Sequence, residues 1–349
     1  MHRRTFTRTL VAAALATTML GTAAGCSDDP DDAASGSGGG NGSLEKITYL
    51  TSFGTFGRDA YAYVAKEKGY FSDAGFDVDI KAGSGTFDNL KAVVGGQAQF
   101  TPLDLTGLLL AAGAKKDPVT GFAAVAGVQQ RTMAAIISLE GNGITTPKDL
   151  EGKTLSDSPS SVVRNLFPTY AKLAKIDYTK VTWKDGQPQT LMGTLASGGA
   201  AGIGQFVVGK PTVESIAKGK KAVVLPYSDY LQDLYGNVLV TSKDYATKNP
   251  EKAKKFTEAL LKGLEDSITN PTEAGQILKK YVPTANPDAA AAELTLMGPF
   301  VRSEASGVPV GALDSQRVAR SIALLQGSGQ IAAGLKPEQV IDFNLVPQA

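Results

Sequence analysis

Cysteine and histidine are almost absent from this chain of 349 residues, in which each occurs once, as Cys26 and His2. A single thiol excludes a disulfide within the chain, so the stability of the fold must come from its apolar core. From residue 44 onward the sequence contains neither a thiol nor an imidazole. This absence excludes Ser-His-Asp and Cys-His nucleophile pairs there, as well as metal sites built on histidine or cysteine. We therefore expect no catalytic residue, no metal and no cofactor, which weighs against an enzyme.

An excess of either charge is also lacking, since 35 Lys and Arg residues stand against 34 Asp and Glu residues, for a net charge of +1. A chain without a basic excess has no electrostatic footprint for the phosphates of nucleic acids. We therefore expect no nucleic-acid partner.

Residues 1–25 have the composition of a secretory signal peptide. Their three arginines form a positive head without any acidic residue, and residues 10–21 form an apolar run that is too short to span a bilayer. Small residues at 23–25 then precede Cys26, an arrangement that resembles the bacterial lipobox, whose cysteine is lipidated before cleavage. The alternative is an ordinary secretory signal followed by a chance cysteine. We predict lipidation of Cys26 and attachment to the membrane through its acyl chains.

Cleavage before Cys26 would leave 32 basic and 34 acidic residues, and thus a net charge of −2. Residues 27–43 are mostly Gly, Ser, Ala and Asp, without a large apolar side chain to pack. A flexible chain of 17 residues has a reach of about 20–25 Å. Residues 26–43 are therefore predicted to be a tether between the lipid and the body of the protein.

From residue 44 onward, short apolar runs and helical patterns alternate, and the series occurs twice in tandem. Strands are expected at 47–51, 76–81, 98–102, 121–127, 133–138, 154–156, 181–184, 203–208, 222–225 and 238–241. Helices are expected at 59–68, 90–94, 106–114, 162–174, 190–196, 250–269, 271–281, 289–297 and 314–325. Repeated strand–helix units predict an α/β protein with mostly parallel sheets and helices on both faces, here in two lobes.

The position of a site follows from this predicted architecture. In open α/β sheets, ligands bind beyond the carboxyl ends of the strands, where helix N-termini point amide groups toward them. In a protein of two lobes these ends can face each other across a cleft, and closure about a hinge then encloses the ligand.

Three segments of the body resemble a known family. They are residues 65–71 (AKEKGYF) with 74–78 (AGFDV), residues 143–153 (GITTPKDLEGK), and residues 239–242 (LVTS) with 249–253 (NPEKA). In this order and spacing they resemble the substrate-binding proteins of ABC importers, in the branch that includes nitrate, sulfonate and thiamine-pyrimidine-precursor binders. The likeness covers almost the whole chain after the predicted signal peptide.

The resemblance implies a periplasmic-binding-protein fold of type II, with a ligand cleft between two lobes. It also implies a division of the chain into a signal peptide (1–25), the tether (26–43), a first part of lobe 1 (44–146), lobe 2 (147–237) and a return to lobe 1 with C-terminal helices (238–349). The implied function is delivery of a small molecule to an ABC permease and its ATPase. The protein would act as a monomer, held by its lipid at the extracytoplasmic face of the cell membrane.

The chain departs from the family's pattern at two places, since Gln99 and Ala201 stand where relatives often have an aspartate. The motifs therefore identify the scaffold better than the ligand. The family also resembles eukaryotic pyrimidine-synthesising enzymes, which depend on histidine and on cysteine-rich iron sites. After the signal peptide this chain has no histidine and only the lipid-blocked Cys26, so we expect no such activity.

The loop after the first predicted strand supplies the first candidate ligand-binding residues: Ser52, Phe53, Thr55, Phe56 and Arg58. Its hydroxyls and backbone amides can hydrogen-bond a ligand, and its two phenylalanine rings can stack on a flat one. The alternative is a turn whose phenylalanines pack beneath the sheet.

The loops after the next two strands contribute three more candidate hydrogen-bonding residues: Ser84, Thr86 and Thr101. The nearby carboxylates Asp88 and Asp104 are at least as well explained as helix caps. Gln129, which follows the buried strand at 121–127, is expected to direct its amide toward the hinge.

The candidates of the second lobe also follow predicted strands: Ser158, Ser160, Ser161, Gln205, Phe206 and Tyr227. The serines precede the helix that begins at Val162, where free amides and hydroxyls suit an anion or a carbonyl oxygen. N-capping alone would also explain them. Trp183, the only tryptophan, lies in a predicted strand and is better explained as part of the core.

As a set, these candidates are rich in aromatic rings, hydroxyls and amides and poor in cations, which suits a flat, polar heterocycle such as a thiamine-related aminopyrimidine. A sulfonate or nitrate would instead need helix amides with one or two cations, for which Arg58, Arg131 or Arg164 is available in the sequence. Two alternatives belong to other classes. One is a surface lipoprotein that senses a solute for a partner receptor, and the other is a cofactor-dependent enzyme that uses tyrosine, lysine or carboxylates.

Overall fold

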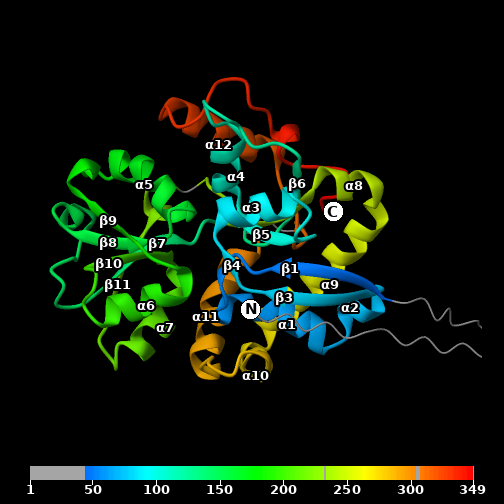
Figure 1. Cartoon of the computed structure of the whole chain (residues 1–349), viewed down its shortest axis with the longest axis horizontal. Coiled ribbons are helices and arrows are strands. Elements are labelled where there is room, and N and C mark those ends of the chain that lie inside the picture. The colour runs from blue at the N-terminus through cyan, green and yellow to red at the C-terminus, as the bar shows by residue number, and fades with distance from the viewer. Residues whose placement is uncertain (1–43, 232, 304–306, 349) are drawn as a thin grey trace, which may run out of the picture. The chain divides into compact units, whose positions relative to one another are not determined.

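The computed structural model describes residues 44–231, 233–303 and 307–348, and the predictions of a signal peptide, of lipidation at Cys26 and of a tether lie outside these ranges. The described residues from 44 onward form one compact unit, in which strands and helices alternate (Figure 1). Its strands fall into two main groups, and we call each group with its helices a lobe.

The first lobe is built on strands that precede and follow the second lobe in the sequence: β1 (Glu45–Leu50), β3 (Phe76–Lys81), β5 (Thr101–Asp104), β6 (Phe122–Gly127) and β12 (Asn237–Ser242). β1 and β3 run parallel, whereas β12 runs antiparallel to both β5 and β6. A parallel bridge between Tyr49 of β1 and Phe100, just before β5, joins these two sets of strands within the first lobe. β6 is buried along its whole length, which is typical of a strand covered on both faces.

The second lobe is built on a five-stranded sheet in the order β11 (Ala222–Pro226), β7 (Ala134–Leu139), β10 (Gly202–Phe206), β8 (Thr154–Asp157) and β9 (Thr182–Asp185). β8 runs parallel to its neighbours β10 and β9, and β7 runs antiparallel to β10 and β11.

Strand β7 lies in the second sheet, although the sequence analysis puts residues 134–139 in the first part of lobe 1. By sheet membership the chain changes lobes between Gly127 and Ala134, and not at residue 146. β6 and β7 are both completely buried apolar runs, and such runs do not indicate which of two sheets will take them.

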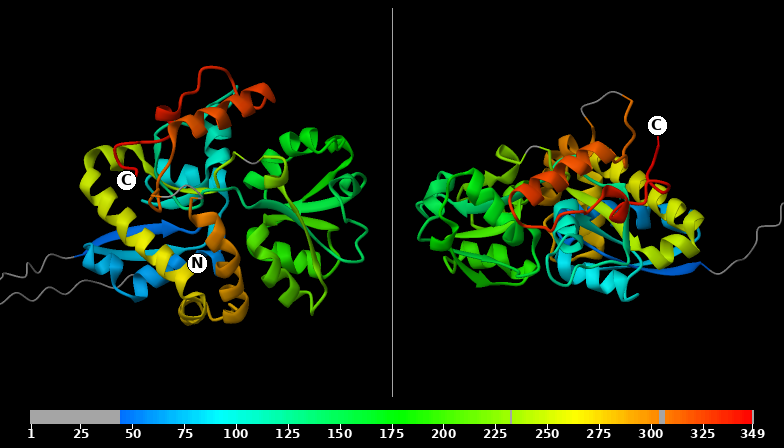
Figure 2. Two further views of the ribbon diagram at one scale, coloured as in Figure 1. Left: turned by 180° about the vertical axis from the view of Figure 1, so that it is seen from behind. Right: turned by 90° about the horizontal axis from the view of Figure 1, so that it is seen from above.

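Helices cover the sheets of both lobes (Figure 2). The helices of the first lobe are α1 (Ala60–Glu67), α2 (Tyr70–Asp73), α3 (Thr86–Val94), α4 (Leu105–Ala112), α8 (Lys243–Lys248), α9 (Pro250–Thr269), α10 (Pro271–Tyr281), α11 (Pro287–Val301) and α12 (Ser315–Gly327). Those of the second lobe are α5 (Val162–Leu173), α6 (Pro188–Ala196) and α7 (Lys210–Ile216). The alternation of strands with helical connections confirms the α/β class that the sequence predicts. The prediction of mostly parallel sheets holds only in part, because β7 and β12 each run antiparallel to both of their neighbours.

The core of the first lobe is centred on Phe256 of α9. Its ring stacks on Phe100 with the centroids 4.0 Å apart and on Phe71 with the centroids 5.0 Å apart. Phe76 of β3 meets the same ring edge-on. Each of these side chains buries a large apolar area, so the cluster fixes α9 against the sheet.

Two chain segments cross between the lobes, residues 128–133 and residues 233–236, and they hydrogen-bond to each other. The Thr132 amide donates to the Leu234 carbonyl at 2.9 Å, and the Gly236 amide donates to the Gln129 carbonyl at 3.2 Å. Paired crossing segments of this kind allow two lobes to rotate about one axis while they stay connected. We call these two segments the hinge.

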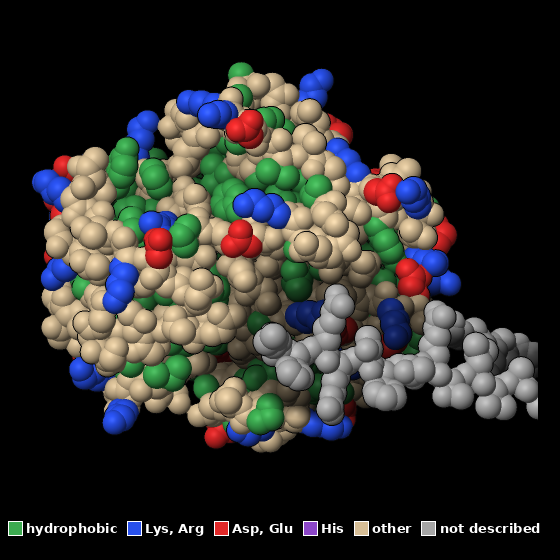
Figure 3. Space-filling view, viewed as in Figure 1, with side chains coloured by type: hydrophobic (Ala, Val, Ile, Leu, Met, Phe, Trp, Pro, Cys, Tyr) green, Lys and Arg blue, Asp and Glu red, His purple; other side chains and the backbone are tan. Residues whose placement is uncertain are grey.

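Lys and Arg side chains are interspersed with Asp and Glu over the face shown in Figure 3, without a large patch of one sign. None of the helices in the described part of the chain combines the length and the apolar character of a membrane-spanning helix.

Candidate functional site

The loop that follows β1 is fixed by a network of buried hydrogen bonds. Its short strand β2 (Phe53–Gly54) pairs with β4 (Gly83–Ser84) from the loop after β3. The Asn89 side-chain amide donates to the carbonyls of Thr51 at 2.8 Å and Ser52 at 3.2 Å. These bonds hold two predicted site loops side by side.

Thr101 belongs to the same network, since its Oγ1 accepts a hydrogen bond from Asn89 Nδ2 at 3.1 Å. Ser84 donates its amide to Asn89 Oδ1 at 2.9 Å, and Thr86 begins α3 and is buried. Asp104 caps α4 as expected, with its carboxylate accepting from the Thr106 amide at 2.9 Å. The prediction that Asp88 is a cap is wrong, because α3 begins two residues earlier and its N-cap is Gly85.

Arg58 is the central cation of this region and is only 2% exposed. Its guanidinium lies 4.6 Å from the ring centre of Phe56 and 4.8 Å from that of Phe206. Nη2 donates to the Phe53 carbonyl at 2.9 Å, while Nε and Nη1 have no hydrogen-bond partner within the described residues. Buried donors without partners are costly, so these two atoms indicate a place where a further group can bind.

Two buried carboxyl groups accompany Arg58. Burial raises the pKa of Asp59 to about 6, although the charge of Arg58 opposes the rise. Burial also raises the pKa of Glu293 in α11, whose Oε2 accepts a hydrogen bond from the Arg58 amide at 3.0 Å. Thr212 of α7 donates to the other oxygen of Glu293. Glu293 therefore connects the Arg58 loop of the first lobe to the second lobe.

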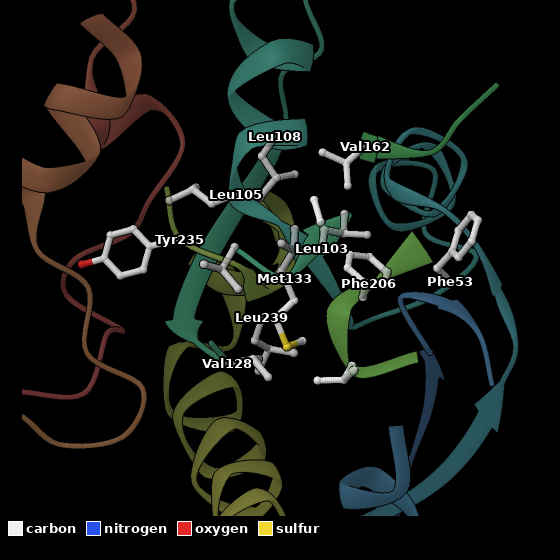
Figure 4. Packing of buried hydrophobic residues seen from close by; sticks show 14 of the residues in the cluster. Phe53, Leu103, Leu105, Leu108, Val128, Met133, Val162, Phe206, Tyr235 and Leu239 are labelled. Atoms are coloured by element: carbon white, nitrogen blue, oxygen red, sulfur yellow. The ribbon is translucent and has the colours of Figure 1, made fainter. Parts of the chain in front are cut away.

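Phe53 and Phe206 meet across the two lobes. Their rings are nearly perpendicular, at 84°, with the centroids 6.3 Å apart (Figure 4). The neighbouring Gln205 is fully buried, and its Oε1 accepts from the Phe206 amide at 3.0 Å. Its Nε2 finds no partner in the part of the chain that the structure describes.

The serine loop before α5 provides a second contact between the lobes. The Ser160 hydroxyl donates to the Ser84 carbonyl at 3.0 Å, and the Phe87 amide donates to the Ser160 carbonyl at 3.3 Å. The Ser158 hydroxyl accepts from the Ser160 amide at 3.2 Å. Ser161 caps α5 by accepting from the Val163 amide at 3.2 Å, as the capping alternative predicts.

Asp157, to which the sequence analysis assigns no role, lies fully buried beside the same loop. Its Oδ1 accepts from the Ser158 amide at 2.7 Å, but Oδ2 is without a partner among the described residues. Burial raises the pKa of Asp157 to about 7. The sequence contains one indication that Asp157 belongs to the site, namely its position at the carboxyl end of a predicted strand. The serines that follow it are the more obvious hydrogen-bonding candidates.

Two predicted site residues make only contacts within the protein. Gln129 lies in the hinge, where its Oε1 accepts from the Asn237 amide at 2.8 Å. Tyr227 is buried in the second lobe, stacks on Tyr170 at 4.2 Å and donates its hydroxyl to the Val163 carbonyl at 3.0 Å. Because these polar groups already have protein partners, the structure adds no support for ligand binding by Gln129 or Tyr227, and both stay predictions.

The two other arginines considered for an anion have protein partners as well. Arg164 forms an ion pair with Asp185 at 2.6 Å. Arg131 donates to the Pro299 carbonyl at 3.1 Å and lies over the ring of Phe300. Arg58 is thus the arginine that the structure brings together with the predicted aromatic residues of both lobes.

The structure therefore gathers Ser52, Phe53, Phe56, Arg58, Ser84, Ser160 and Phe206 around the contact between the lobes. Ser52 is buried there, and its hydroxyl has no partner within the described ranges. Thr55 and Phe56 also line an adjoining pocket of about 490 Å³. The described part of the chain contains no group of three or more acidic side chains that could together hold a metal ion.

A family model described as "NMT1/THI5 like" matches residues 59–274. Over 70% of its length the chain is 26% identical to the formylaminopyrimidine-binding protein of Halalkalibacterium halodurans, 72% of which is covered. It is 23% identical to the riboflavin-binding protein RibY of Chloroflexus aurantiacus, over 87% of both chains. It is 25% identical to the 4-amino-5-hydroxymethyl-2-methylpyrimidine phosphate synthase of Schizosaccharomyces pombe, over 69% of this chain and 70% of that protein.

Among solved structures, the alkanesulfonate-binding protein SsuA of Xanthomonas axonopodis pv. citri superposes with a TM-score of 0.66 at 15% identity. The match covers 88% of this chain and 99% of that one. Such a likeness establishes the fold, which is the type II periplasmic-binding-protein fold that the sequence analysis expects.

Proposed function

Because the chain belongs to the NMT1/THI5 like family, we propose that it is the substrate-binding component of an ABC importer. It takes one small molecule between its lobes, closes about the hinge and delivers the molecule to a permease and its ATPase. It works as a monomer at the extracytoplasmic face of the membrane, anchored by a lipid on Cys26. Catalysis is not part of this proposal.

The observation that carries the proposal is the meeting of Arg58 with aromatic residues of both lobes. Phe206 comes from the second lobe, and Phe53 and Arg58 come from the first. Arg58 is buried there with two N–H groups unpaired within the described residues. A ligand that accepts these hydrogen bonds interacts with both lobes at once, and it therefore favours the closed arrangement.

We propose a flat nitrogen heterocycle as the ligand, such as a thiamine-related aminopyrimidine. The planar guanidinium of Arg58 lies over the rings of Phe56 and Phe206, and a planar ligand can stack on aromatic rings in the same way. Arg58 and Gln205 Nε2 offer donors, whereas Asp157 Oδ2 offers an acceptor. An aminopyrimidine needs both kinds of partner. Two relatives of this chain are named for binding formylaminopyrimidine and riboflavin, which are also nitrogen heterocycles.

A sulfonate or nitrate is the second candidate, and the unpaired Nε and Nη1 of Arg58 favour it. Neighbouring N–H groups of one guanidinium suit two oxygens of an anion. The carboxyl groups of Asp59 and Glu293 are nevertheless buried close enough to this arginine to interact with its charge, and any negative charge on them opposes an anion there. For this reason we place the neutral heterocycle first.

Thermal unfolding and titration calorimetry with aminopyrimidines, thiamine, riboflavin, alkyl sulfonates and nitrate test the proposal. At 100 times its Kd a ligand adds about 2.7 kcal/mol to the free energy of unfolding, so the midpoint rises by several degrees. We expect this rise with an aminopyrimidine, and Phe206→Ala should weaken its binding about tenfold or more. Tyr178→Ala, at an exposed site on the second lobe, serves as the control.

A rise with sulfonates alone would support the anion instead, particularly if Arg58→Lys abolished it while Phe206→Ala had little effect. No rise with any compound would contradict both ligand classes and favour the alternative of a solute-sensing lipoprotein. Mass spectrometry of the recovered ligand checks the absence of catalysis, because a chemically changed ligand would show an enzyme.

A further inference from the structure

A pocket of about 490 Å³ lies beside the candidate site and is lined by residues of both lobes. The first lobe contributes Thr55 and Phe56 from the loop after β2 and Asn286 from the start of α11. The second lobe contributes Thr212, Ser215 and Ile216 from α7. We call this space the outer pocket.

Phe56 is in contact with both the outer pocket and Arg58. Its ring lines the pocket, and the Arg58 guanidinium lies 4.6 Å from the ring centre. The same guanidinium lies 4.8 Å from the ring centre of Phe206. The outer pocket is thus one aromatic ring away from the place where we propose that the polar part of the ligand binds.

The outer pocket is completed by contacts between the lobes. Asn286 Nδ2 donates to Ser215 Oγ at 3.2 Å. About two helical turns further along α11, Glu293 accepts a hydrogen bond from Thr212. Separation of the lobes would break both contacts and divide the walls of the pocket. Whatever occupies the pocket is therefore enclosed in the same closing motion as the proposed ligand.

The lining of the outer pocket is uncharged. Every described residue that lines it is aliphatic, aromatic, a glycine, a hydroxyl or an amide. A charged group placed there would lose hydration without gaining an ionic partner, whereas an apolar group gains by leaving water. The volume lies within the range of small-molecule pockets, about 300–1,000 Å³.

We propose that the outer pocket binds an uncharged, mainly apolar substituent of the same molecule whose planar polar part binds at Arg58. The substrates are then substituted heterocycles and not bare rings. This inference rests on the proposed function, because it requires a ligand between the lobes.

The test compares two compounds by titration calorimetry with the full chain: 4-amino-2-methylpyrimidine and its 5-hexyl derivative. We expect the hexyl compound to bind about tenfold more tightly, since several methylene groups leave water. In Ile216→Lys the charge enters the outer pocket, and this advantage should disappear while the Kd of the parent compound changes less than about twofold.

Leu173→Lys is the matched control. Leu173 and Ile216 are both the last residues of helices in the second lobe, and they are 42% and 45% exposed. Equal thermal midpoints of the two variants show that both fold. Only Ile216→Lys should affect the hexyl compound.

Two outcomes would overturn the inference. If the parent compound binds but the hexyl compound gains nothing, or keeps its gain in Ile216→Lys, the outer pocket does not take the substituent and the proposed function still stands. If neither compound binds to the unaltered chain, the proposed heterocycle class is wrong, and the inference fails with it.

Discussion

Gly204 illustrates how one missing side chain makes room for a buried carboxyl group. A Cβ at this position would lie 1.9 Å from Asp157 Oδ2, and the backbone there has no positive φ that would by itself require glycine. Since Asp157 is fully buried, its carboxylate has little freedom to move aside. Position 204 in strand β10 therefore requires glycine, because Asp157 of β8 occupies the space that a Cβ would need.

We expect Gly204→Ala to lower the free energy of unfolding by about 2 kcal/mol or more, because the added methyl group forces Asp157 or a strand to shift. Chemical denaturation of the variant measures this loss. Gly193→Ala in α6 is the control, since a Cβ there meets no atom within 4 Å. It should raise stability by about 0.5–1 kcal/mol. Equal effects of the two substitutions would contradict this explanation.

The residues of the candidate site differ in how far the sequence alone reveals them. Phe53, Arg58 and Phe206 follow predicted strands, and loops at that end of an α/β sheet are where ligand groups are expected. Glu293 was not foreseen, because it lies 235 residues from Arg58 in the chain and within an alanine-rich helix. Only the packing of α11 against the Arg58 loop gives it a role.

At the scale of the elements, helix α12 contacts both segments of the hinge through Arg317. Its Nη2 donates to the Gln130 carbonyl at 2.5 Å in one hinge segment, and its Nε donates to the Asp233 carbonyl at 2.9 Å in the other. The same guanidinium lies 3.9 Å from the ring centre of Tyr235. One side chain therefore holds both crossing segments.

We predict that Arg317→Met loosens the hinge and lowers the free energy of unfolding by about 1–3 kcal/mol, since a charged donor shared by several carbonyls is lost. Hydrogen exchange of the Thr132 amide, which pairs with Leu234, should become faster. Arg320→Met on the same helix is the control, because the Arg320 side chain is 56% exposed and its interaction among the described residues is an exposed ion pair with Asp233. Unchanged exchange in Arg317→Met would show that α12 does not hold the hinge.

The sequence predicts some elements to the residue and misses others. The strand at 76–81 and the helices at 250–269 and 271–281 agree with the structure, and both helices begin with proline at a position that favours it. The strand expected at 98–102 is formed by Thr101–Asp104. The sequence analysis does not predict helix α7, because seven residues with few apolar side chains show no clear helical periodicity of hydrophobic positions.

At the scale of the whole molecule, several carboxyl groups are buried with raised pKa values. Burial raises the pKa of Asp157 to about 7 and those of Asp59 and Asp104 to about 6, from an ordinary value of 3.8. The folded state therefore binds these protons more tightly than the unfolded chain. Stability from this source is complete below pH about 4 and is lost as the pH rises to about 7.

We predict that Asp157→Asn reduces the dependence of stability on pH between pH 5 and 7. A single group that titrates between its unfolded and folded pKa values changes the free energy of unfolding by at most about 1.4 kcal/mol per pH unit. Denaturation curves at several pH values measure the slope, and the variant should also be the more stable protein at pH 7.5. Asp149→Asn is the control, because hydrogen bonds from Thr145 and Thr146 hold the pKa of Asp149 below its usual range. Identical slopes for the Asp157 variant and the unaltered chain would contradict the prediction.

The path of the chain between the lobes also sets an order of assembly during synthesis. The second sheet is made of one continuous stretch, from β7 to β11. The three-stranded sheet β5–β12–β6 of the first lobe lacks its middle strand until residue 242 has been made, and the bridge between Ala124 of β6 and Ile341 forms later still. A nascent chain can therefore complete the second lobe while the first lobe, whose sequence begins earlier, still waits for its last strand. The lobe that begins first in the sequence is therefore the last to reach its full stability, and until then its exposed strand edges are open to wrong pairing.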